Sequence, residues 1–199
     1  MPPFMRISLR NDKENLLLRL NHKMHKSCYP ALKETSTKAV VGKGDFRAKI
    51  MFIGEAPGKN EDEFGEPFLG ASGKILDSLL ESIQMKRSEV YITNVFKYRP
   101  KGNRDPAKKE IAVCEEWLTE EIRIVDPVLI VTLGRHAMHR FAPDLKISDS
   151  HGCVFQTATS NRNRKTVLTL YHPAATLYNK KLQKVLFDDF QKIPALLER

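Results

Sequence analysis

The sequence predicts an α/β fold, a three-layer αβα sandwich around a central, mainly parallel four-stranded sheet. Two observations lead to this prediction. Short apolar runs rich in β-branched residues recur four times, and segments with apolar residues at helical intervals lie between them. Such alternation favours a parallel sheet with helices on both faces. The predicted strands are Ile50–Ile53, Val90–Phe96, Val128–Leu133 and Thr166–Leu170.

The predicted helices precede, separate and follow these strands. Apolar periodicity predicts a short amphipathic helix over residues 9–20, within a helical N-terminal arm over residues 1–27. Because 199 residues can bury a substantial core, we expect residues 1–199 to form a single domain that includes this arm. Further helices are predicted over residues 74–80, 107–124, 135–141 and 182–197. Irregular structure is expected over residues 21–49, 98–106 and 142–164, the last with room for a hairpin through Val154 and Phe155.

Composition indicates a soluble protein inside the cell. The chain is 41% hydrophobic and 29% charged, and no apolar run approaches the roughly 20 residues that span a bilayer. The N-terminus lacks the apolar core of a signal peptide, and Asp12 and Glu14 are unlike a transit peptide. We therefore expect no membrane contact and an intracellular location, cytoplasmic (nucleoid) or nuclear depending on the source. Cys28, Cys114 and Cys153 are odd in number and widely spaced, so no disulfide framework is expected.

The net charge of +9 is concentrated in three stretches. Residues 1–49 hold eleven Lys/Arg against four acids, residues 97–109 six against one, and residues 160–184 six against none. Basic stretches that converge on one face would hold a polyanion. Ordinary solvated lysines explain the charge equally well, so charge alone leaves both interpretations open.

The stretch from Gly54 to Gly73 is unusual because it carries five acids in a basic chain. It joins the first predicted strand to a helix, and ligands collect at such junctions in α/β folds. Polar residues follow three of the predicted strand ends: Glu55, Asn94 and His172. Because the carboxyl ends of parallel strands lie along one edge of a sheet, we expect these three side chains to meet in one cleft.

Common phosphate and metal motifs are absent from the sequence. Gly73-Lys74 lacks the earlier glycine and the following hydroxyl residue of a P-loop, since Phe68 and Ile75 occupy those positions. The dinucleotide-binding pattern G-x-G-x-x-G is also missing after the first strand. His136 and His139 could share one side of a helix, but no third ligand is evident in the sequence, so no metal site is predicted.

Four motifs occur in order along the chain. They are Gly54-Glu-Ala-Pro-Gly58 followed by Glu61-Asp62, Gly65–Phe68 and Gly70–Gly73; Thr93-Asn94; Arg99-Pro100 with Asn103-Arg104; and His172-Pro173-Ala174. Together they resemble the type-four uracil-DNA glycosylases of the uracil-DNA glycosylase superfamily, and the ending over residues 188–193 is also similar. The resemblance covers roughly residues 28–197.

This resemblance implies a monofunctional DNA glycosylase. Such an enzyme flips uracil out of DNA, hydrolyses its N-glycosidic bond and leaves an abasic site for base excision repair. Phe68 resembles the aromatic residue that stacks on the extruded base. Asn94 resembles the residue that accepts from uracil N3–H and donates to O4. Without the resemblance, a core phenylalanine and a turn asparagine would be the ordinary interpretations.

The remaining pocket residues follow from the same resemblance. His172 corresponds to the donor to uracil O2, where negative charge develops as the bond breaks. Glu61 corresponds to the acid near uracil C5 that excludes the methyl group of thymine. Glu55 resembles the acid that orients the attacking water. Other uracil-DNA glycosylases have an aspartate at the next position, here Ala56, so we expect an oxocarbenium-like path with weak base assistance.

Contacts with DNA are expected from Arg99, Lys101 and Arg104 in the basic segment. Leu177 is the predicted wedge that fills the gap left by the flipped base; Tyr178, or a helix-capping role for Leu177, is the alternative. We expect DNA containing uracil, single- or double-stranded, as the partner of a monomeric protein.

Type-four enzymes hold a four-iron four-sulfur cluster through four cysteines. This chain keeps the first and fourth, Cys28 and Cys114, whereas Ala31 and Tyr98 stand at the second and third positions. Two thiolates cannot hold a cluster that needs about four. We therefore expect no metal cofactor and small apolar packing roles for Cys28 and Cys114. The alternative is a cluster with substitute ligands such as Cys153, His25 or Tyr98.

Two other functions remain open at the level of sequence. One is a glycosylase for another deaminated base, such as hypoxanthine, and the other is a catalytically silent DNA-binding module of the same fold. The presence of all five pocket side chains argues against the silent module: Glu55, Glu61, Phe68, Asn94 and His172.

Overall fold

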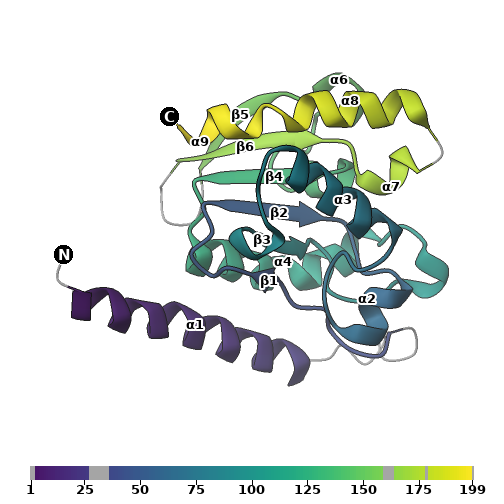
Figure 1. Cartoon of the computed structure of the whole chain (residues 1–199). Coiled ribbons are helices and arrows are strands. Elements are labelled where there is room, and N and C mark those ends of the chain that lie inside the picture. The colour runs from purple at the N-terminus through teal and green to yellow at the C-terminus, as the bar shows by residue number, and fades with distance from the viewer. Residues whose placement is uncertain (1–2, 27–35, 159–163, 178, 199) are drawn as a thin grey trace.

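The computed structural model describes residues 3–26, 36–158, 164–177 and 179–198, and a six-stranded sheet lies at its centre (Figure 1). In the order β1-β3-β2-β4-β6-β5, the four inner strands run parallel and the two edge strands antiparallel. The predicted αβα fold with a mainly parallel sheet is confirmed, and the four predicted strands are the parallel ones. The strands are β1 (Lys43–Gly44), β2 (Ile50–Gly54), β3 (Tyr91–Asn94), β4 (Leu129–Leu133), β5 (Val154–Ala158) and β6 (Arg164–Leu170).

The edge strand β1 was not predicted from the sequence, and β5 was left open as part of a hairpin. β1 is two residues long and lies in a segment expected to be irregular. β5 is one arm of the hairpin that the sequence left open, with Val154 opposite Leu168. Its residues alternate between exposed and half-buried, so it lacks the continuous apolar run that identifies an inner strand.

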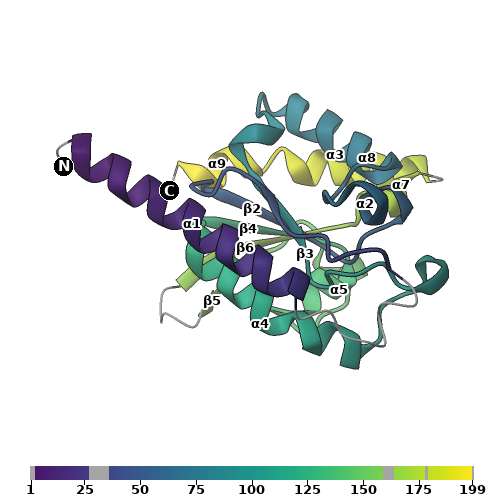
Figure 2. The same ribbon diagram turned by 90° about the horizontal axis from the view of Figure 1, so that it is seen from below.

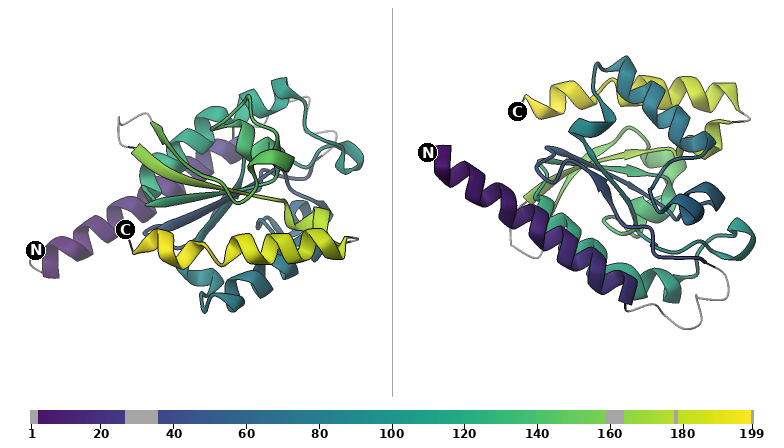
Figure 3. Two further views of the ribbon diagram at one scale, coloured as in Figure 1. Left: turned by 90° about the horizontal axis from the view of Figure 1, so that it is seen from above. Right: turned by 60° about the horizontal axis from the view of Figure 1, so that its bottom comes forward.

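Helices cover both faces of the sheet (Figures 2 and 3). On one face lie α3, α8 and α9, and on the other lie α4 and α5, with α1 alongside α4. Within the described ranges, no helix is both long and apolar enough to cross a membrane. The helices are α1 (Pro3–Lys26), α2 (Lys59–Phe64), α3 (Ala71–Ser82), α4 (Lys108–Val125), α5 (Arg135–His139), α6 (Ile147–Ser150), α7 (Pro173–Thr176), α8 (Lys180–Phe190) and α9 (Ile193–Leu197), with short 3₁₀ turns η2 (Arg87–Glu89) and η3 (Lys101–Asn103).

Two apolar cores lie on the two faces of the sheet, and β2 contributes to both. Ile50 and Phe52 belong to the core beneath α3 and α8, whereas Met51 and Ile53 belong to the core beneath α4. Successive side chains of a strand point to opposite faces, so an unbroken apolar run is what a strand buried on both sides requires. This is why the inner strands were visible in the sequence.

Helix α1 is longer than the predicted segment of residues 9–20. Leu17 and Leu20 are buried in the core that contains α4. Lys13 Nζ donates a 2.9 Å hydrogen bond to the carbonyl oxygen of Val125, the last residue of α4. These contacts attach α1 to the outer side of α4.

Two predicted elements differ from the structure. The stretch between β2 and α3, expected to be a loop, contains the six-residue helix α2. This helix has no apolar stripe; its buried residues are the acids Glu61 and Asp62, and Asp62 accepts bonds of 2.7 and 2.8 Å from Thr37 N and Oγ1. The single last helix expected from about Leu182 is instead two helices, and Pro194 lies in the first turn of the second.

Strand register positions the functional edge of the sheet. Gly54 pairs with Asn94 at the end of β2 and β3, and Leu133 pairs with Leu170 at the end of β4 and β6. The residues that follow these pairs, including Glu55 and His172, therefore leave the sheet along one edge.

Candidate active site

A cavity of about 330 Å³ opens at the carboxyl edge of the parallel strands. Its volume lies within the range of small-ligand pockets, about 300–1,000 Å³. Eight of the residues predicted from the sequence line it: Glu55, Ala56, Glu61, Phe68, Asn94, Arg104, His172 and Leu177. The other two predicted residues, Arg99 and Lys101, are absent from its lining.

Asn94 supplies an unsatisfied acceptor to this cavity. The residue is the last of β3 and only 2% exposed. No donor in the described part of the chain reaches its side-chain oxygen Oδ1. Leaving a buried polar atom unpaired costs about 1–3 kcal/mol, so such atoms in a cavity indicate a ligand.

Phe68 forms an aromatic wall of the same cavity. Its side chain is 5% exposed and joins the apolar core, yet its ring also lies against the His172 ring, with centroids 5.6 Å apart. The backbone of Phe68 has φ of 57°, which is unusual for a residue with a side chain. A Cβ at Gly54 would lie 2.5 Å from Asn94 Oδ1 and 2.6 Å from the Phe68 ring, so only glycine fits between them.

Glu61 holds the segment that follows Phe68. Its carboxylate oxygen Oε1 accepts hydrogen bonds of 2.8 Å from both Leu69 N and Gly70 N. The side chain is 6% exposed and lines the cavity. Glu61 therefore has a structural function in this segment and also lines the cavity.

His172 offers a proton donor to the cavity. Its Nδ1 accepts a 3.1 Å hydrogen bond from Ala174 N at the start of α7, which leaves the proton of the neutral ring on Nε2. Burial lowers the pKa of His172 to about 4, with Glu61 opposing the shift and His136 adding to it. At neutral pH the ring is therefore an uncharged Nε2–H donor.

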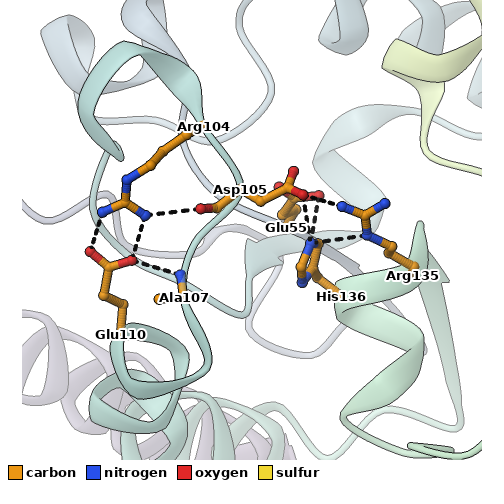
Figure 4. A network of polar contacts seen from close by, with 7 residues as sticks. All are labelled: Glu55, Arg104, Asp105, Ala107, Glu110, Arg135 and His136. Atoms are coloured by element: carbon orange, nitrogen blue, oxygen red, sulfur yellow. Dashed lines mark hydrogen bonds and ion pairs between the residues drawn. The ribbon is translucent and has the colours of Figure 1, made fainter.

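Glu55 lies at the end of β2 within a network of charged groups (Figure 4). Burial, followed by the nearby Asp105 carboxylate, raises the pKa of Glu55 to about 7, and Arg135 opposes the shift. His136 Nε2 lies 3.9 Å from Glu55 Oε2 and 3.8 Å from Asp105 Oδ2. A carboxyl group that is half ionised near pH 7 suits general-base chemistry.

The same network brings three possible metal-ligand atoms together. Glu55, Asp105 and His136 each place one such atom within 4.8 Å of the others. Arg135 already occupies this position, because it donates a 3.2 Å bond to His136 Nε2 and forms an ion pair with Asp105. His139, considered with His136 in the sequence, instead contacts the Leu145 carbonyl oxygen at 3.0 Å. The arrangement favours an arginine-centred ion pair over a metal site.

The predicted DNA-contacting residues lie on or beside the basic loop, residues 98–106. Arg99 Nε donates to Asn103 Oδ1 at 2.8 Å, and Lys101 is exposed in η3. Arg104 is held by two bonds to Glu110, of 2.8 and 2.7 Å. Leu177 ends α7 and is 42% exposed, while the alternative wedge Tyr178 lies outside the described residues.

The described cluster positions do not fit an iron–sulfur ligand set. Cys114 is fully buried in an apolar cluster, and burial raises the pKa of its thiol to about 11. Tyr98, at the third cysteine position, is buried beside it, with its hydroxyl donating to Met24 O at 3.4 Å. With a phenol at the third position, Cys114 is the one thiol that the described cluster positions supply, whereas a cluster needs about four ligands. Cys28 and Ala31 lie outside the described residues.

Sequence reasoning missed Asp105, Arg135 and the role of His136. A signal for them is present in the sequence, because Arg135 and His136 follow Gly134 at the end of β4, where the functional edge of the sheet lies. Asp105 was counted only as the lone acid of a basic segment. Its contact with Arg135, 30 positions away, depends on the loop conformation.

Comparison with known proteins shows the family of this chain. A family model for the uracil DNA glycosylase superfamily matches residues 41–193. The chain is 44% identical over 171 residues to the type-4 uracil-DNA glycosylase of Sulfurisphaera tokodaii, covering 80% of this chain and 75% of that protein. It is 43% identical over 170 residues to the enzyme of that name from Archaeoglobus fulgidus, with 83% and 85% covered. With that of Thermotoga maritima it shares 33% over 189 residues, with 94% and 97% covered. The chain therefore belongs to the uracil DNA glycosylase superfamily and, within it, to the type-4 uracil-DNA glycosylases.

Proposed function

We propose that this chain hydrolyses the N-glycosidic bond of uracil in DNA and leaves an abasic site. The observation that supports this most strongly is the unpaired Asn94 Oδ1 in a cavity walled by the Phe68 ring. Uracil supplies what both groups lack: an N3–H donor for the amide oxygen, an O4 acceptor for the amide N–H, and a flat face for the ring. Cytosine presents an acceptor at N3 and a donor at N4, so the same amide rejects it.

In the proposed reaction, His172 acts on the departing base, and Glu55 acts on the water molecule that adds to the sugar. When the bond between C1′ and N1 breaks, its electron pair moves onto the base, and the Nε2–H of His172 stabilises the charge that develops on O2. A water molecule adds to C1′, and Glu55 accepts its proton. The products are an abasic site and a uracil anion; the anion takes up a proton on release, and Glu55 gives its proton back to solvent.

Glu61 is proposed to discriminate against thymine. Its carboxylate is fixed by Leu69 N and Gly70 N, so it cannot easily move away from a methyl group at C5. The amide of Asn94 does not by itself distinguish uracil from hypoxanthine, because N1–H and O6 of hypoxanthine repeat the same pattern. Pocket size must separate these two bases.

The direct test is base release from oligonucleotides that carry uracil, hypoxanthine or a thymine mismatch, in single- and double-stranded form, followed by alkaline cleavage. Uracil release is expected. Release of hypoxanthine alone would support the alternative substrate, and no release from any oligonucleotide would leave only the silent DNA-binding module. Removal of the donor in His172→Ala is expected to lower the single-turnover rate by about 10²–10³-fold. Unchanged rates in both Asn94→Ala and His172→Ala would contradict the site assignment.

We further propose that this member carries no iron–sulfur cluster. The buried Tyr98, which stands at the third cysteine position and packs in one apolar cluster with Cys114, supports this. Iron and sulfide analysis, with visible absorbance, of protein purified without oxygen tests it. Stoichiometric iron and sulfide would show that other ligands hold a cluster.

The expected partner is DNA, bound by a monomer through the basic loop. Arg99 and Lys101 are positioned on this loop outside the cavity, where a phosphate backbone would pass. If they contact phosphates, binding must weaken steeply as salt rises. Comparing single- and double-stranded uracil DNA will determine the preferred strand state.

A further inference from the structure

The side chains around Glu55 come from two parts of the chain, the basic loop and the start of α5. Asp105 lies on the basic loop, next to Arg104. Arg135 and His136 begin α5, directly after β4. Figure 4 shows these side chains converging on Glu55 from the two sides.

Each contact in the network has a definite direction. Arg135 Nε donates to His136 Nε2, so Nε2 carries a lone pair and has no proton to give to Glu55. Burial and Arg135 lower the pKa of His136, which keeps its ring uncharged at neutral pH. The charged groups facing Glu55 are therefore Asp105 from the basic loop and Arg135 from α5, while Lys59, Glu61 and His172 line the same cavity.

We propose that Asp105 and Arg135 are positioning residues for the proposed reaction: one side-chain atom of Asp105 lies within 4.8 Å of the Glu55 carboxylate, Arg135 forms an ion pair with Asp105, and the opposite charges of this pair set how readily Glu55 accepts a proton. This inference rests on the proposed function. It adds that the basic loop acts on the water-activating group as well as on DNA. Any displacement of the loop moves Asp105 relative to Glu55 and so couples loop position to hydrolysis.

A charge effect on Glu55 and a purely structural role predict different results for substitutions at Asp105 and Arg135. Asp105→Asn and Arg135→Gln break the same ion pair, so a purely structural role predicts the same effect for both. The proposed role predicts opposite effects, because Asp105 raises the pKa of Glu55 and Arg135 lowers it. Both side chains are more than half exposed, so neither substitution removes core packing.

The experiment measures single-turnover uracil release from pH 5 to 9, with enzyme in excess. In the wild type, the rate is expected to fall below about pH 7. In Asp105→Asn the midpoint of this fall is expected to move down by about one pH unit, and in Arg135→Gln up by about one unit. The Asp105→Asn enzyme would then exceed the Arg135→Gln enzyme by about 10-fold or more at pH 6.

Two further variants complete the test. Asp105→Glu retains the charge and is expected to restore the wild-type midpoint. Glu120→Gln breaks an exposed ion pair with Arg123 on α4 and touches none of the groups around Glu55, so its midpoint is expected to stay at the wild-type value. Midpoints that stay fixed, or that move in the same direction in Asp105→Asn and Arg135→Gln, would overturn the proposal.

A second measurement separates this inference from the proposed function. NMR titration of the Glu55 side-chain carboxyl carbon in the free protein needs no substrate. If the wild type released no uracil, the proposed function would fail, while opposite shifts of the Glu55 titration in the two variants would still support the charge arrangement. Unshifted titrations would refute it whatever the activity.

Discussion

Two buried polar groups lie three residues apart at the end of β3, and their surroundings differ. Lys97 is fully buried and donates to Thr93 Oγ1 and Glu121 Oε2, and Glu121 also accepts from Gly42 N and Tyr91. The Asn94 oxygen has no donor anywhere in the described residues. A buried polar network in which every member is paired stabilises one fold. An unpaired acceptor that faces a cavity can instead accept a hydrogen bond from a ligand.

Hydrogen-bond pairing separates structural from functional polar residues in this short segment. If charge alone indicated function, Lys97 and Glu121 would be better candidates for functional residues than Asn94. Their hydrogen bonds indicate a structural role instead, because their polar groups already bind each other. We therefore expect substitutions at Lys97 to affect stability first, and substitutions at Asn94 to affect catalysis first.

The largest expected effect is that of Lys97→Met on stability. Removing one partner leaves Glu121 as an uncompensated buried charge, so the free energy of unfolding is expected to fall by about 3–5 kcal/mol. Urea denaturation measures this loss. The double variant Lys97→Met/Glu121→Gln is expected to recover most of it, because no buried charge remains and the amide oxygen can still accept from Gly42 N and Tyr91. A single variant as stable as the wild type would show that the pair is not structural.

Asn94→Ala is expected to lower the single-turnover rate on uracil DNA by about 10²–10³-fold. Its free energy of unfolding is expected to change by less than about 1 kcal/mol, because the side-chain oxygen makes no hydrogen bond in the free protein. Paired rate and urea measurements check both values. A large loss of stability with a normal rate per folded molecule would place Asn94 in the structural class with Lys97.

The dependence of rate on pH distinguishes the two titrating groups of the cavity, Glu55 and His172. Glu55 accepts a proton only when ionised, and with a pKa of about 7 the rate is expected to fall about 10-fold per pH unit below that value. His172, with a pKa of about 4, stays neutral over this range and adds no second fall above pH 5. A pH–rate profile from 5 to 9 with one acid limb is the expected result.

Stability should respond to the same two groups with opposite signs. Between about pH 4.5 and 7 the folded state retains a proton on Glu55 that the unfolded chain loses, so this contribution to stability falls as pH rises. Between about pH 4 and 6.5 the unfolded chain protonates His172 but the folded state does not, so this contribution rises with pH. Urea denaturation of Glu55→Gln at pH 5 and 8 isolates the second trend.

The smallest expected effect is that of Leu177→Ala. If Leu177 fills the gap left by a flipped base, its truncation is expected to lower the rate on double-stranded uracil DNA by about fivefold and to affect single-stranded DNA less, because a single strand needs no gap filled. Unchanged rates on both substrates would favour the helix-capping role, because Leu177→Ala keeps the backbone N–H that donates to Ala174 O.

The sequence predicted the inner sheet and the principal pocket residues for identifiable physical reasons. β2 and β4 are buried on both faces and are therefore continuously apolar, which fixes where their carboxyl ends lie. The positions of Glu55, Asn94 and His172 follow from those ends. Contacts that depend on loop conformation could not be predicted in the same way: Gly102 and Asn103 both have positive φ and turn the basic loop so that Asp105 reaches Arg135.

Helix α2 and strand β1 were missed for a different reason. α2 consists of six residues held by backbone and carboxylate bonds, as when Asp62 accepts from Thr37, and it shows no apolar period. β1 has only Lys43 and Gly44, both exposed. Periodicity detects elements that bury apolar surface, and these two elements bury almost none.

The close approach of Asn94 and Phe68 to Gly54 limits how the base preference of this chain can be altered. With no room for a single methyl group between Asn94 and Phe68, the amide and the ring are in effect one rigid unit whose spacing is set by the backbone. Directed evolution of substrate preference will find few productive changes at these three positions in combination. New preferences are more readily reached at lining residues with exposed side chains, such as Leu177.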